Sequence, residues 1–169
     1  MSSSSPTSTL DVDAQPGKPP MLRVDAPDDA PRWAAEHRDA LRAAVVQHGS
    51  LLVRGLGLRD VAGTEAVFRQ LGSLMTEREA FAPRRRYSDG VYSASKWPAN
   101  QQMCMHHELS YMLEFPGLML FACLSAATEG GATAVADSPT VLDAATRSRR
   151  RLDSAQSRLK SFAGRGQQH

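Results

Sequence analysis

From Trp33 to His48, large side chains return every three or four positions, as one face of a helix requires. Pro31 suits the first helical turn, and Gly49 suits the position after the last one. The pattern therefore predicts a helix over residues 31–48.

The next apolar run is shorter and has a different pattern. SLLVRGL, at residues 50–56, contains glycine near its end and predicts a buried strand. Asp60 suits the N-cap of a second helix, which is expected to end near Gly72. A short extended piece is predicted earlier, at residues 21–24. These elements indicate an α+β fold rather than a repeat.

Residues 77–100 are polar and irregular. They contain the basic run RRR at residues 84–86, the turn SDG at residues 88–90 and a predicted strand at residues 91–95. A long loop of this kind often covers a site. An ordinary solvated loop is the simpler interpretation of the three arginines.

Three further strands are predicted at residues 103–111, 118–124 and 132–136. The dipeptides PG at residues 116–117 and GG at residues 130–131 supply the turns before the last two. Ser138 and Pro139 suit the N-cap and the first position of a helix that follows.

Composition limits the class of protein. The 169 residues, of which 41% are apolar and 22% charged, fit one soluble globular domain. The longest apolar run, at about residues 118–127, is shorter than the ~18 residues of a membrane span, so no membrane is expected as a partner.

The start, MSSSSPTSTL, does not resemble a secretory signal. Two cysteines, Cys104 and Cys123, make no disulfide framework, and a cytoplasmic location is predicted.

The charges divide the chain into parts. Residues 147–169 carry a balance of +6, which leaves −4 for the rest of a chain whose net charge is +2. The body therefore offers no broad basic face, and the tail has no aromatic residue except Phe162, so nucleic acid is not expected as a partner. We expect a disordered arm at residues 1–30, rich in Ser, Pro and Asp, a folded portion at residues 31–146 and a disordered basic tail at residues 147–169.

Residues 100–137 carry the candidate chemistry. Residues two apart on a strand share a face, so His106 and Glu108 are expected to converge. One imidazole and one carboxylate are two of the three groups of the 2-His-1-carboxylate iron site. A zinc-protease motif would need histidine at position 111, which is Tyr111. His-x-Glu is weak evidence by itself, and a surface pair is the competing interpretation.

The surroundings of this pair resemble a known family. NQQMCMHHELSY, LEFPGLMLFACLSA and EGGATAVADS, in that order, resemble the TauD/TfdA family of Fe(II)- and 2-oxoglutarate-dependent oxygenases. Within it they are most similar to the SyrP-like members of peptide-antibiotic pathways. The resemblance covers about residues 43–145. It implies part of a double-stranded β-helix, or jelly roll, with flanking helices.

The resemblance also implies site residues and cofactors. His106 and Glu108 would bind Fe(II), and Thr133, 27 positions after His106, would contact the carboxylate of 2-oxoglutarate. A Thr133 that only satisfies its own strand backbone is the alternative. No separate catalytic side chain is predicted. Because Glu108 is retained, where related halogenating enzymes have a small residue, hydroxylation is implied. The implied substrate is an amino acid or a carrier-bound aminoacyl group.

The end of the chain departs from the family pattern. Family members have a distal histidine followed by an arginine, whereas this sequence ends 61 residues after Glu108, at His169. We therefore expect a member truncated at the C-terminus or shifted in frame near Ala145. A non-catalytic remnant or binding module of the same fold is the alternative function. An interaction protein using the basic tail is a weaker one.

Overall fold

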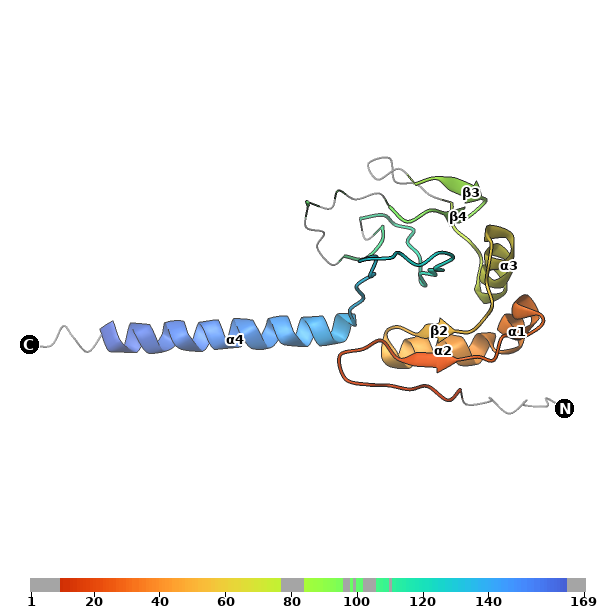
Figure 1. Cartoon of the computed structure of the whole chain (residues 1–169). Coiled ribbons are helices and arrows are strands. Elements are labelled where there is room, and N and C mark those ends of the chain that lie inside the picture. The colour runs from red at the N-terminus through yellow and green to blue at the C-terminus, as the bar shows by residue number, and fades with distance from the viewer. Residues whose placement is uncertain are drawn as a thin grey trace, which may run out of the picture. The chain divides into compact units, whose positions relative to one another are not determined.

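The structure is a computed structural model of the whole chain (Figure 1). It describes residues 10–76, 84–95, 98, 100–101, 106–109 and 111–163. The chain divides into two compact units, Met1–Val135 and Ala136–His169, and each is described by itself. The elements are β1 (Met21–Arg23), α1 (Ala30–Glu36), α2 (Arg38–His48), β2 (Leu52–Arg54), α3 (Val61–Leu71), β3 (Arg86–Ser88), β4 (Val91–Tyr92) and α4 (Ser138–Ala163).

Strands β1 and β2 form a two-stranded parallel sheet. Leu22 pairs with Val53, and the amide of Val24 donates to the Arg54 carbonyl over 2.8 Å. The prediction of an extended piece near residue 21 is confirmed. The prediction of a buried strand at residues 50–56 is wrong in length and burial, because β2 has three residues and Leu52 is 37% exposed. The strand ends at Gly55, whose φ of +91° turns the chain away.

The helix predicted over residues 31–48 is interrupted. His37, at φ −103° and ψ 6°, separates α1 from α2. Asp29 caps α1 by accepting the amide of Arg32 over 2.9 Å, and Gly49 ends α2 at a φ of +77°. The predicted element is therefore two helices with the expected outer ends.

The second predicted helix is confirmed as α3. Asp60 accepts the amide of Gly63 over 2.7 Å, and Gly72 follows the last turn. The Thr64 side chain, 3% exposed, donates to the Asp60 carbonyl over 2.8 Å. Helix α1 packs against α3. The buried apolar residues in these helices and β1 are Leu22, Ala34, Leu41, Ala44 and Val67.

Strands β3 and β4 form a short antiparallel hairpin. Arg86 pairs with Tyr92, and the predicted turn at residues 88–90 joins the strands. Gly90 has a φ of +85°, and any side chain there would meet Leu74. The strand predicted at residues 91–95 ends at Tyr92. This hairpin brings the residues just before β3 into a defined position.

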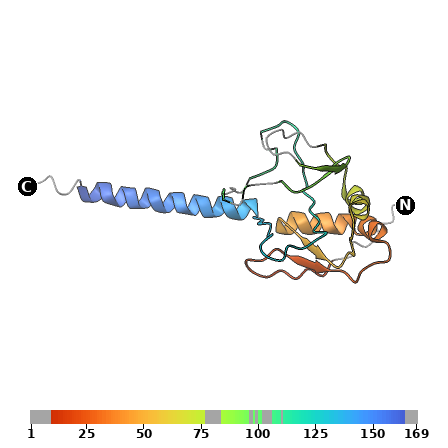
Figure 2. The ribbon, with the colours of Figure 1, turned by 45° about the horizontal axis from the view of Figure 1, so that its top comes forward.

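In the described residues of the second half, the predicted strands are not observed. In the described residues from 106 to 137 there is no helix or strand, and Figures 1 and 2 show an irregular trace between residue 111 and the start of α4. Of the strand predicted at 103–111, residues 103–105 and 110 lie outside the described part. Leu113, Phe115 and Phe121 are 101%, 62% and 64% exposed. Strands form only against hydrogen-bonding neighbours, and the described residues supply just two two-stranded sheets, so no extensive jelly roll is present.

The second unit contains the single long helix α4 (Figure 2). Asp137 is the N-cap, because its carboxylate accepts the amide and hydroxyl of Thr140 over 3.0 and 2.7 Å. The predicted cap, Ser138, is one residue late. The prediction of a disordered segment from residue 147 differs from the structure, where α4 continues to Ala163. Among the described helices, none has the length and apolar character needed to cross a membrane.

Candidate metal centre

His106 and Glu108 bring an imidazole and a carboxylate together. Nε2 of His106 lies 3.9 Å from Oε1 of Glu108. The histidine side chain is 52% exposed and the glutamate side chain 21% exposed. Glu108 lies in a turn and His106 in the irregular segment just before it, so the predicted convergence arises from a backbone conformation other than a strand.

That conformation depends on the next residue. Leu109 has a φ of +54°, the left-handed region that a branched side chain seldom adopts. Its side chain is buried, at 8% exposure. Burial of a leucine side chain stabilises the fold by ~1.5–3 kcal/mol, which is enough to offset the cost of the left-handed backbone. Leu109 therefore anchors the turn that presents Glu108.

Arg84 contacts the candidate ligand Glu108. Its Nη2 donates to Oε1 over 3.2 Å and to Oε2 over 3.4 Å. The arginine side chain is 15% exposed, so the ion pair is largely shielded from water. Sequence patterns gave no signal for this contact, because Arg84 belongs to a basic run interpreted as a solvated loop and lies 24 positions from Glu108.

Thr133 is exposed and lies in the irregular segment that follows Gly130 and Gly131. These glycines have φ values of +68° and +70°, as expected for the predicted turn. The strand that was expected to orient the Thr133 hydroxyl is not formed, so the structure gives this side chain no fixed direction toward Glu108.

A third metal ligand is not found beside the pair in the described part of the chain. Among those residues, no three His, Cys, Asp or Glu side chains are placed so that they could hold one ion. The two donor atoms that are present still fit one ion. Bonds of about 2.1 Å to both would require the donors to lie within about 4.2 Å of each other, and they are 3.9 Å apart.

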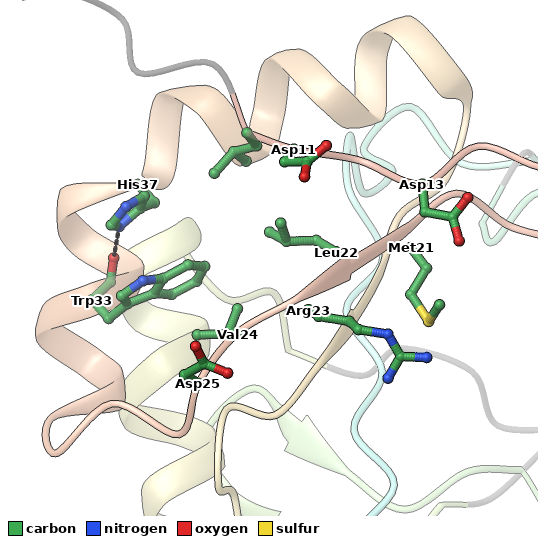
Figure 3. A pocket seen from close by; sticks show the side chains of 10 residues that line it. Asp11, Asp13, Met21, Leu22, Arg23, Val24, Asp25, Trp33 and His37 are labelled. Atoms are coloured by element: carbon green, nitrogen blue, oxygen red, sulfur yellow. Dashed lines mark hydrogen bonds between the residues drawn. The ribbon is translucent and has the colours of Figure 1, made fainter.

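A hollow lies elsewhere in the first unit. It has a volume of about 470 Å³ between the segment at residues 10–13, β1 and helix α1. Figure 3 shows Trp33 and His37 along one side, with Leu22 facing them. The two rings stack at a centroid distance of 4.3 Å, and Nδ1 of His37 donates to the Trp33 carbonyl over 2.8 Å. None of the predicted site residues lines this hollow.

A second hollow, of about 400 Å³, lies between the residues that precede α1 and those that precede α3. Asp29 and Asp60 line it, but both carboxylates cap their own helices. The predicted site residues are absent from its lining as well, so the candidate chemistry stays with the turn at residues 106–109.

The sequence of the chain is similar to those of known proteins. The profile of the family described as "Taurine catabolism dioxygenase TauD, TfdA family" matches residues 13–167. The "Dapdiamide synthesis protein DdaC" of Enterobacter agglomerans is 32% identical over 101 residues, which cover 57% of this chain and 30% of that protein. The chain thus spans less than a third of this curated relative. No solved structure matches the chain. Because the family match extends over most of the sequence, the chain belongs to the TauD/TfdA family of dioxygenases.

Proposed function

We propose that this chain acts as an Fe(II)- and 2-oxoglutarate-dependent oxygenase of the hydroxylase type. The observation that carries the proposal is the 3.9 Å approach of His106 Nε2 to Glu108 Oε1 in a chain of the TauD/TfdA family. Neutral imidazole and carboxylate together suit a first-row divalent ion and leave other coordination positions open.

The bound groups would supply the oxidation, with O2 consumed and succinate and CO2 released. The protein's own part is to hold and orient. His106 and Glu108 would hold the ion, and the buried Leu109 fixes the turn that carries them.

The proposed substrate is an amino acid or a carrier-bound aminoacyl group, in the synthesis of a peptide natural product. Similarity to a protein named for dapdiamide synthesis supports this class. A panel of free amino acids and aminoacyl carrier proteins tests it. A member of the panel that is a substrate should raise succinate formation above the background seen with 2-oxoglutarate alone. Succinate formation at background with every member would exclude this substrate class.

Thr133 is the proposed contact of the 2-oxoglutarate carboxylate. Its support is its position after a Gly-Gly turn, 27 residues beyond His106. Thr133→Val removes the hydroxyl and keeps the shape, so it should weaken 2-oxoglutarate binding while Fe(II) binding stays unchanged. Equal 2-oxoglutarate affinity in both proteins would refute this role.

An anaerobic titration tests the function as a whole. Fe(II) and 2-oxoglutarate added to the full chain should produce the visible charge-transfer band of the iron chelate, and O2 with substrate should then yield succinate. Absence of both signals would leave the alternative function, a non-catalytic binding module of the same fold.

A further inference from the structure

The Glu108 carboxylate is already paired with a positively charged side chain. Arg84 donates to both of its oxygens, over 3.2 and 3.4 Å, through the single nitrogen Nη2. The two side chains are 15% and 21% exposed, which is low for a pair of charged residues in this chain. A partly buried carboxylate without a partner would destabilise the fold, so the arginine stabilises Glu108 in its observed position.

The arginine and the histidine approach the same oxygen. Oε1 of Glu108 lies 3.2 Å from Nη2 of Arg84 and 3.9 Å from Nε2 of His106. An ion shared by His106 and Glu108 would therefore come close to the guanidinium. Two cations that share one carboxylate oxygen repel each other, and partial burial weakens the screening by water.

We propose that Arg84 is a positioning residue that holds Glu108 in the metal-free chain and competes with the metal ion for its carboxylate. The inference rests on the proposed function, because it takes His106 and Glu108 as metal ligands. Metal binding then requires the guanidinium to turn away from Oε1. The ion pair thereby lowers the affinity of the site for free divalent ions while keeping the ligand in place.

The same basic run supplies a matched control. Arg86, two residues later, pairs with Asp89 over 2.7 Å, and both side chains are more than 60% exposed. Arg86→Gln removes one positive charge from the same basic run and leaves the ion pair between Arg84 and Glu108 in place. Any effect of net charge alone would therefore appear equally in Arg84→Gln and Arg86→Gln.

A titration with Mn(II) measures the competition directly. Free Mn(II) is followed by electron paramagnetic resonance in the metal-free full chain and in the variants R84Q, R84K and R86Q. We expect R84Q to bind Mn(II) about three- to tenfold more tightly, R84K to lie between R84Q and the natural chain, and R86Q to match the natural chain. Equal or weaker binding by R84Q would overturn the inference.

A double-mutant cycle separates failure of this inference from failure of the proposed function. Urea unfolding of the metal-free natural chain, R84Q, E108Q and the double variant reports whether the two residues are coupled. If no protein binds Mn(II) at millimolar concentration while the coupling is present, the ion pair stands, and both the metal site and the competition are refuted. If the natural chain binds Mn(II) and the coupling is zero, only the role of Arg84 is refuted.

Discussion

Nε2 of His106 lies 3.9 Å from Oε1 of Glu108, close enough for one ion to bond to both. His107, the next residue, is also exposed and is not one of the two residues joined by this distance. We expect His106→Ala to lower the affinity for Fe(II) at least tenfold and to abolish the charge-transfer band. His107→Ala is the matched control and should keep both. An equal loss in the two variants would contradict the assignment of His106 as the ligand.

Gly55 allows β1 and β2 to approach. At its φ of +91°, a Cβ atom would collide with the backbone carbonyl of Val24. Gly57, at φ +71°, has nothing within 4 Å of the same position. Gly55→Ala should therefore cost more than ~2 kcal/mol of the free energy of unfolding, and Gly57→Ala only about 1 kcal/mol of backbone strain. Urea denaturation of both variants checks this, and equal losses would show that the sheet tolerates the side chain.

Val67 is a test of the small helical core. It is 2% exposed, whereas Val46, also in a helix, is 87% exposed. Val67→Ala removes two buried carbon atoms and should lower the free energy of unfolding by about 2–3 kcal/mol. Val46→Ala should change it by less than about 0.5 kcal/mol. Denaturant midpoints of similar size for the two variants would mean that α3 is not packed as described.

Asp137 makes the start of α4 sensitive to acid. The hydroxyl and amide of Thr140 lower the pKa of Asp137 below its ordinary value of 3.8. A carboxyl whose folded pKa is lowered stabilises the helix above its unfolded pKa, and this contribution is lost as the pH falls through the folded value. In the natural chain, the helical signal in circular dichroism should therefore decrease when the pH is lowered beyond about 3.8.

The variant Asp137→Asn isolates this effect. Asparagine is also a good N-cap but does not titrate, so its helical signal should change less than that of the natural chain between pH 5 and pH 2. Parallel curves for the two proteins would show that acid acts elsewhere in α4.

Local signals in the sequence were sufficient for the helices of the first unit. Asp60 and Gly72 mark the ends of α3, and Gly49 marks the end of α2, because caps depend on neighbouring residues only. The interruption at His37 could not be predicted in the same way. The side chains around it continue the helical spacing, and only the backbone angles of His37 separate the two helices.

The second half shows why the strands could not be predicted. The apolar run at residues 118–124 favours a strand, but a strand also needs a neighbouring strand to pair with. Among the described residues none pairs with this segment, and Phe121 within it is 64% exposed. The apolar run is a property of the local sequence, whereas pairing depends on residues far along the chain.

The candidate site was predicted only in part. A spacing of two on a strand predicts that His106 and Glu108 converge, and the structure brings them to 3.9 Å without forming that strand. The contact from Arg84 depends on how the β3–β4 hairpin is placed, which no motif in the sequence encodes. The role of Thr133 rests on its place in a Gly-Gly-x-Thr turn that resembles the family and on its separation from His106, and with an exposed side chain it stays a proposal.

The left-handed backbone of Leu109 persists beside Glu108 because the leucine side chain is buried. Its φ of +54° costs roughly 1–2 kcal/mol, which burial of the side chain offsets. The position of the Glu108 carboxylate therefore depends on a neighbouring apolar side chain that cannot itself bind an ion.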